Sequence, residues 1–160
     1  MSFFTDLLSN NTSKKSLALP LVISAALLSA CNGAPSNPDV KARQDMMKNW
    51  GDAMGVMGDM VKAPDTFDPE VFKEQAAFLA NDAKNPWPHF EDESAVGHAT
   101  KAVWSDADGF RSESENLQKV ASELNAAAQN ATSVADVEAE FKAVGGSCKS
   151  CHTDYKVKDD

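Results

Sequence analysis

The residues best suited to chemistry lie near the end of the 160-residue chain, in the segment Cys148-Lys149-Ser150-Cys151-His152. Cys-x-x-Cys-His is the attachment signature of a c-type haem. Two thiols add to the two vinyl groups of the porphyrin, and the adjacent imidazole binds the iron from the proximal side. The segment therefore predicts one covalently bound haem c, attached through Cys148 and Cys151, with His152 as the proximal iron ligand.

The same segment has two alternative interpretations. A redox dithiol of the thioredoxin type should lie near the start of a βαβ pattern, and the sequence shows no such pattern. A structural zinc site needs four ligands. Apart from His152 the chain has only His89 and His98, and it has no second Cys-x-x-Cys. These observations favour haem attachment over both alternatives.

The third cysteine, Cys31, follows a segment that is typical of an export signal. Two lysines precede an apolar run over residues 16–28, and the run closes with Leu-Ser-Ala-Cys. Those four residues resemble the lipobox of bacterial lipoproteins, in which cleavage leaves the cysteine as a lipid-modified N-terminus. We therefore expect a signal peptide over residues 1–30 and a polar tether over 31–37 that begins at a lipidated Cys31. An ordinary signal peptide with a free thiol at Cys31 is the alternative.

Export agrees with the haem motif, because c-type attachment in bacteria takes place outside the inner membrane. We expect a domain in the periplasm or cell envelope that is held to a membrane by its lipid alone. The sequence has no apolar run of about 18 residues, which a spanning helix would need. It carries 15 Lys and Arg against 24 Asp and Glu, so nucleic acid is a poor partner.

The composition and the periodicity predict an all-α protein. Alanine and methionine are abundant, whereas β-branched residues and tyrosine are scarce. Four amphipathic helices are expected to begin at Pro38, at Asp68-Pro69, at Ser105 and at Ser133. Their predicted inner stripes are Val40, Arg43, Met47, Trp50, Met54, Met57 and Val61; Phe72, Ala76, Leu79 and Ala83; Phe110, Leu117, Ala121, Leu124 and Ala128; and Val134, Val137, Phe141, Val144, Cys148, Cys151 and Tyr155.

These helices predict an antiparallel four-helix bundle over residues 38–160, with both cysteines on its buried side. Gly145-Gly146 would normally end a helix, but the apolar stripe continues through them, so we expect one unbroken helix. The long connection over residues 84–104 is expected to close one end of a cofactor pocket.

Arg43 is the unusual member of the first stripe, because a buried guanidinium needs partners. The two propionates of a haem would supply an acidic partner, and we expect Arg43 to contact one of them. The alternative is a surface arginine at the start of a helix, whose aliphatic stem covers apolar neighbours.

The chain resembles the class II cytochromes c, the family of cytochrome c′ and cytochrome c556, over about residues 40–158. A class I cytochrome c fits poorly, since such domains usually carry the motif near their N-terminus. The resemblance depends on the order and spacing of several short motifs. These are Arg43-Gln44 followed by Met47, Pro86-Trp87, Trp104-Ser105-Asp106, and the Cys-x-x-Cys-His segment.

The resemblance implies roles for individual residues. Arg43 and Gln44 would lie beside the haem propionates, and Met47 would face the distal side of the iron. Lys156 stands where relatives often have an arginine, so the positive charge is kept but planar bidentate bonding is lost. His98 falls in a loop that approaches a propionate in relatives, although a solvated histidine is the simpler interpretation.

Two functions are implied. The first is a cytochrome c′ type protein with five-coordinate iron, which transfers electrons or binds nitric oxide or carbon monoxide, with Met47 covering the sixth position. The alternative is a six-coordinate, low-spin electron carrier of the cytochrome c556 type, with Met47 as axial ligand. We do not expect an enzyme, because no acid–base constellation accompanies the haem. Expected partners are redox proteins or a diatomic gas, with a homodimer allowed.

Overall fold

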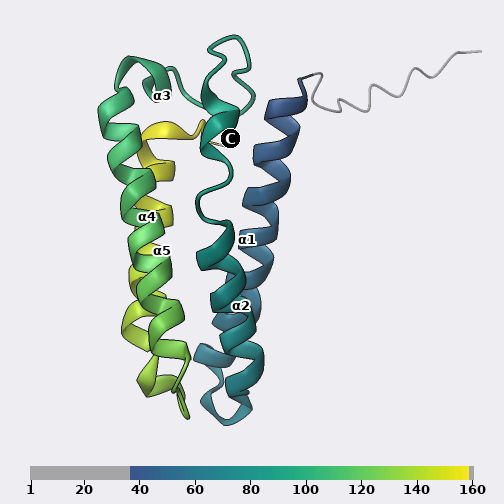
Figure 1. The fold of residues 1–160 in the computed structure, drawn as a ribbon, viewed down its shortest axis with the longest axis vertical. Coiled ribbons are helices and arrows are strands. Elements are labelled where there is room, and N and C mark those ends of the chain that lie inside the picture. Colours follow the sequence, from purple (N-terminus) through teal and green to yellow (C-terminus); the bar gives the residue numbers. More distant parts are fainter. Residues whose placement is uncertain (1–36, 159–160) are drawn as a thin grey trace, which may run out of the picture. The chain divides into compact units, whose positions relative to one another are not determined.

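The structure is a computed structural model that describes residues 37–158, so the predicted signal peptide and Cys31 lie outside the described residues. Within residues 37–158 the chain forms four long helices in an antiparallel bundle (Figure 1), which confirms the predicted fold class. The long helices are α1 (Pro38–Lys62), α2 (Pro69–Asp82), α4 (Ala107–Ala128) and α5 (Glu138–Tyr155). The shorter elements are α3 (Ala102–Ser105) and the 3₁₀ turns η1 (Pro64–Thr66), η2 (Trp87–Phe90) and η3 (Val134–Asp136).

The first two long helices begin where their capping residues predict. The side chain of Asn37 accepts a hydrogen bond from the backbone N–H of Asp39 at 2.8 Å, and a proline occupies the first turn of α1. The side chain of Asp68 accepts from the backbone N–H of Glu70 at 3.0 Å, again with a proline in the first turn. Each cap satisfies donors that the helix itself leaves without a partner.

The other two helix starts differ from the prediction. Ser105 does not cap α4, because it is the last residue of the one-turn helix α3. The cap is Asp106, whose backbone leaves the helical region and whose side chain accepts from the N–H of Gly109 at 3.3 Å. Ser133 forms a capping box with Asp136, but the box begins η3, and α5 begins only after it.

The predicted continuity of α5 is confirmed. Gly145 and Gly146 lie inside the helix on its exposed side, and a Cβ atom at either position would meet nothing within 4 Å. The two glycines therefore reduce helix propensity without interrupting the apolar stripe that carries Cys148 and Cys151.

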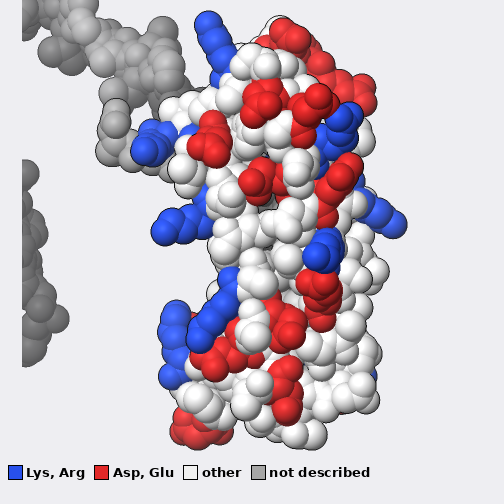
Figure 2. All heavy atoms as spheres, turned by 90° about the vertical axis from the view of Figure 1, so that its left-hand side faces the viewer, with Lys and Arg blue, Asp and Glu red and all other residues white. Residues whose placement is uncertain are grey.

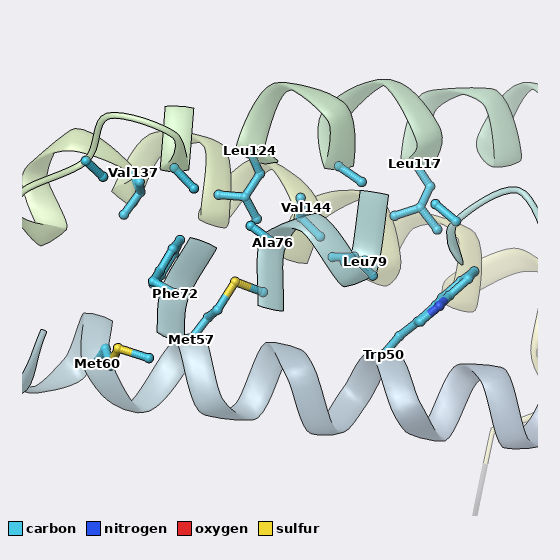
Figure 3. Close-up of a cluster of buried hydrophobic side chains, with 14 residues drawn as sticks. Trp50, Met57, Met60, Phe72, Ala76, Leu79, Leu117, Leu124, Val137 and Val144 are labelled. Atoms are coloured by element: carbon cyan, nitrogen blue, oxygen red, sulfur yellow. The ribbon is translucent and has the colours of Figure 1, made fainter. Parts of the chain in front are cut away.

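The apolar core runs through the interior of the bundle (Figure 3), and Cys148 of the haem motif packs against it. Phe72, Ala76 and Leu79 of α2 and its C-cap residue Ala83 are buried, as predicted. Val144 of α5 and its N-cap residue Val137 belong to the same cluster. Large side chains in this cluster include Trp50, Met57, Phe72, Leu79, Leu117 and Leu124. Burial of these side chains supplies the main stabilising free energy of the bundle.

The helices pack in the order α1 on α2, α2 on α4 and α4 on α5. By contrast, α1 and α5 make almost no direct backbone contact with each other. Cavities lined by residues of both helices occupy the space where they would otherwise pack. The bundle thus leaves room beside the haem motif.

The long connection between α2 and α3 is fastened to the C-terminal end of α5, beside which it lies in Figure 1. The backbone N–H of Thr100 donates to the carbonyl of Tyr155 at 2.9 Å, and the N–H of Val157 donates to the carbonyl of His98 at 2.9 Å. Two segments that are distant in the sequence are thereby joined immediately after the haem motif.

Gly97 lies at the point where this connection meets α1. Its backbone has φ +53°, and a Cβ atom there would lie 2.6 Å from the side chain of Val40. Both the left-handed backbone and the close approach require glycine at this position.

Acidic and basic side chains alternate along the face shown in Figure 2. Among residues 37–158, no helix is both long enough and apolar enough to cross a membrane.

We predict that Gly97→Ala lowers the free energy of unfolding by about 1–3 kcal/mol, because it combines a strained backbone with a clash against Val40. Thermal or urea unfolding measures the effect. Gly55→Ala is the matched control: Gly55 is exposed inside α1 with nothing within 4 Å of an added Cβ. The control should raise stability by about 0.5–1 kcal/mol. Equal effects of the two substitutions would contradict the proposed packing of Gly97.

Candidate functional site

The last turns of α5 present the three predicted haem-binding side chains. Cys151 and His152 follow Cys148 by three and four residues, one helical turn later, so all three side chains lie toward the same side of α5. Both cysteines are half-buried, and neither forms a disulfide. Burial raises the pKa of Cys148, and burial together with nearby acidic charge raises that of Cys151 to about 11. In the unmodified chain both sulfurs are therefore protonated thiols at neutral pH.

His152 carries a ring that is suited to bind iron. The residue as a whole is exposed, but its ring borders two cavities and is partly shielded from water. This shielding, and secondly the positive charge of Lys156, lower its pKa. A lowered pKa favours the neutral imidazole, which is the form that coordinates a metal.

The larger cavity has a volume of about 690 Å³, within the range of cofactor pockets. It lies between the beginning of α1, the connection after α2 and the end of α5. The connection therefore closes one end of the cavity, as predicted. Its lining includes Val40, Trp87, Phe90, Ala95, Phe110 and Tyr155.

A second cavity of about 230 Å³ lies deeper, between α1, α2, α4 and α5. Four residues line both cavities: Met47, Trp87, Cys151 and His152. The two cavities are thus neighbouring parts of one site, with the predicted distal side chain and the predicted proximal ligand on the wall of each.

The residues present fit a haem. Two thiols and a neutral imidazole border the cavities, which supplies the donor set for thioether attachment and axial coordination. Phe110 extends the apolar wall by edge-to-face contacts with Trp87 at 5.8 Å and with Phe90 at 5.0 Å between ring centres. An apolar, aromatic wall suits the faces of a porphyrin.

Arg43 is buried, with 4 % of its surface exposed, so the surface alternative is wrong. Its guanidinium donates hydrogen bonds to three carbonyls of the connection, those of His89 at 2.8 Å, Val96 at 2.7 Å and Ala95. It also lies 4.4 Å from the ring centre of Phe90. Burial lowers the pKa of Arg43, while the negative charge of Asp39 partly offsets this.

The buried guanidinium therefore finds partners in backbone carbonyls rather than in a carboxylate of this chain. A guanidinium has five N–H donors, and Arg43 also lines the larger cavity. Its predicted contact with a propionate stays a prediction that is compatible with these three bonds.

The remaining predicted residues also border the larger cavity. Gln44, Met47 and Lys156 are half-buried, whereas His98 is exposed at the rim. The exposure of His98 agrees with the interpretation as a solvated histidine, and its backbone carbonyl has the clear structural role of joining the connection to Val157.

Tyr155 is a wall residue whose hydroxyl is fixed by α4. It donates a hydrogen bond to Asp106 at 2.7 Å, and its ring contacts Phe110 at 5.3 Å between ring centres. The hydrogen bond, with burial and neighbouring negative charge, raises the pKa of Tyr155 to about 12. Asp106 thus both caps α4 and holds the last turn of α5.

The sequence analysis missed Glu113. This residue of α4 borders the smaller cavity together with both cysteines and His152, and it accepts a hydrogen bond from Ser150 at 2.9 Å. The available signal was its place one helical turn before Leu117, a predicted inner residue. Among residues 37–158, no group of three or more His, Cys, Asp and Glu side chains is placed to hold a metal ion, so the zinc alternative gains no support.

Comparison with known proteins gives consistent matches. The family model described as cytochrome c′ matches residues 39–156. Cytochrome c′ of Alcaligenes xylosoxydans xylosoxydans is 32% identical over 119 residues, which cover 74% of this chain and 93% of the relative. Cytochrome c-556 of Agrobacterium tumefaciens (strain II Chrys) is 29% identical over 121 residues, which cover 75% of this chain and 98% of the relative.

Among solved structures, a nitric oxide complex of a variant of cytochrome c prime from Alcaligenes xylosoxidans is similar to this chain. It superposes with a TM-score of 0.71 at 30% identity. The match covers 76% of this chain and 94% of that structure. The similarity thus includes the bundle and the site together.

We predict that Arg43→Ala lowers the free energy of unfolding by about 1–3 kcal/mol, because buried carbonyls of the connection lose a charged donor. Arg111→Ala is the control: Arg111 is exposed and pairs with Asp108 one turn away, so its loss should change stability by less than about 0.5 kcal/mol. Denaturant unfolding monitored by circular dichroism measures both. Equal free energies of unfolding for the two variants would contradict a stabilising role of Arg43.

Proposed function

The chain belongs to the cytochrome c′ family, a family of c-type haem proteins with one covalent haem c on a four-helix bundle, and on that premise we propose that it binds diatomic gases at a five-coordinate haem iron. In this proposal Cys148 and Cys151 carry the haem and His152 is the proximal ligand. When bound, the haem supplies an iron that exchanges one electron or binds nitric oxide or carbon monoxide.

One observation carries the choice of a gas-binding site: the surroundings of Met47 are apolar. Its half-buried side chain borders both cavities, and the smaller cavity around it is lined by Trp50, Met54 and Leu79. A methionine in such a place acts as a flexible apolar cover. The similar structure from Alcaligenes xylosoxidans is a nitric oxide complex, which supports the same ligand class here.

The second candidate is a six-coordinate electron carrier with Met47 as axial ligand. A thioether is a soft ligand that stabilises low-spin iron and raises its reduction potential. The relative named cytochrome c-556 covers the same part of the chain at comparable identity, which supports this candidate. In either case the partner is a redox protein or a small gas, and we propose that the protein is not an enzyme.

Two further proposals concern the location and the assembly of the chain. We propose export to the periplasm or cell envelope, with a lipid on Cys31 as the membrane anchor; the bacterial origin of the relatives supports the location. The allowed homodimer is supported by exposed apolar side chains on neighbouring helices, Val56 of α1 and Val71 and Phe78 of α2.

Absorption spectra test the function. The haem should remain with the polypeptide after denaturation and acid–acetone extraction, and the ferric protein should be high-spin. Met47→Ala should speed binding of nitric oxide or carbon monoxide to the ferrous protein, because the covering side chain no longer has to move, and should leave the resting spectrum nearly unchanged. A low-spin wild type with a sulfur-to-iron charge-transfer band that Met47→Ala abolishes would instead establish ligation and the electron-carrier function.

We predict that Cys31→Ser moves the protein from the membrane fraction to the soluble fraction, because the lipid-modified thiol is lost. Fractionation of cells that produce each form, with haem staining of the gels, measures the change. Wild-type protein that is already soluble and has a free thiol at Cys31 would show that the lipidation proposal is wrong.

A further inference from the structure

Glu113 places a carboxylate on the wall of the haem site. It is a half-buried residue of α4 that borders the smaller cavity together with Cys148, Cys151 and His152. One carboxylate oxygen, Oε1, accepts a hydrogen bond from the hydroxyl of Ser150 at 2.9 Å. Ser150 lies between the two cysteines, so this bond fixes the acid against the haem motif itself.

The second oxygen of Glu113 is the unusual one. Oε2 is buried and has no hydrogen-bond partner, and it is the one buried side-chain nitrogen or oxygen atom in residues 37–158 of which this is true. A buried polar atom without a partner costs free energy and calls for an explanation. The cations of the same helix are engaged elsewhere, since Arg111 pairs with Asp108 and Lys119 lies 3.9 Å from Glu123.

Glu113 lies where its negative charge can interact with a haem attached at Cys151. Its carboxylate is hydrogen-bonded to Ser150, the residue next to Cys151, and both Glu113 and Cys151 border the same cavity. A haem attached at Cys151 would therefore lie close to this charge, and the partly buried site screens the interaction less than water would.

We propose that Glu113 is a charge-supplying residue that stabilises the ferric state of the bound haem and so lowers its reduction potential. Reduction adds one electron to the iron and removes one unit of positive charge from the haem. A fixed negative charge nearby favours the state with the larger positive charge, which is the ferric state. The inference rests on the proposed function, because it requires a haem attached at Cys148 and Cys151.

The proposal explains both oxygens of Glu113. The bond to Ser150 holds the carboxylate in place beside the haem motif, and the second oxygen keeps its charge because no protein donor is bonded to it. A role in helix packing alone would not need a charge there, since a glutamine has the same shape and could accept the same bond from Ser150.

The test compares midpoint potentials by spectroelectrochemical titration of the holoprotein. Glu113→Gln should shift the equilibrium toward the ferrous form about tenfold, which corresponds to about 59 mV for one electron. Glu115→Gln is the matched control, because Glu115 lies on the same helix but is exposed; it should change the equilibrium by less than twofold. The difference between the two variants should persist at 1 M salt, where exposed charges are screened beyond about 3 Å.

Two further measurements separate the possible results. Glu113→Asp keeps the charge and should shift the potential less than Glu113→Gln; equal shifts would mean that shape rather than charge acts, and would overturn the proposal. Pyridine haemochrome assays report the haem content of each variant. A wild type without covalent haem would refute the proposed function, whereas full haem content with an unchanged potential in Glu113→Gln would refute this inference alone.

Discussion

A single buried positive charge organises the end of the bundle that holds the functional site. The guanidinium of Arg43 binds carbonyls of His89, Ala95 and Val96, which belong to the connection between α2 and α3. Burying a guanidinium is costly unless its donors are satisfied. The connection must therefore fold back over α1 at this point, and in doing so it forms one wall of the larger cavity. Gly97 permits the close approach that this requires.

The bundle performs two physical tasks. Side chains of α1, α2, α4 and α5 form one apolar core (Figure 3), and burial of that core stabilises the fold. Near the haem motif the same helices leave cavities, whose walls include the core residues Trp50, Leu79 and Leu117, and specific polar contacts hold this end of the bundle together. The bond between Tyr155 and Asp106 and the pairing of His98 with Val157 are two of these contacts. A rigid core next to a site with room for a cofactor is what a covalent haem requires.

Sequence reasoning predicted the features that depend on local chemistry. The start of α1 at Pro38, the unbroken α5 through Gly145 and Gly146, and the bundle itself follow from helix-start residues and helical periodicity. Its errors arose where two local signals competed or where the partner is distant in the sequence. Ser105 and Asp106 are adjacent residues that could each cap α4. Ser105 belongs to the short helix α3, which periodicity cannot detect, so the cap is Asp106.

The hydrogen-bond partners of buried polar groups could not be predicted from local sequence patterns, because these partners lie far away in the sequence. The contact of Arg43 with a haem propionate stays a prediction, but the sequence did not indicate its partners within the chain, which are carbonyls about 50 residues away whose positions depend on the whole connection. The place of Glu113 one turn before Leu117 gave only a weak periodic signal, because its contact with Ser150 joins two helices that are distant in the sequence. For Met47, the sequence leaves open whether its sulfur would bind the iron or only cover it. Its backbone is fixed on both sides, since Arg43 binds the connection and Trp50 donates a hydrogen bond to Asp82 of α2 at 2.7 Å. Under the two proposed functions, ligation and covering of the iron would differ in the position of this one flexible side chain. The same scaffold would therefore serve either function.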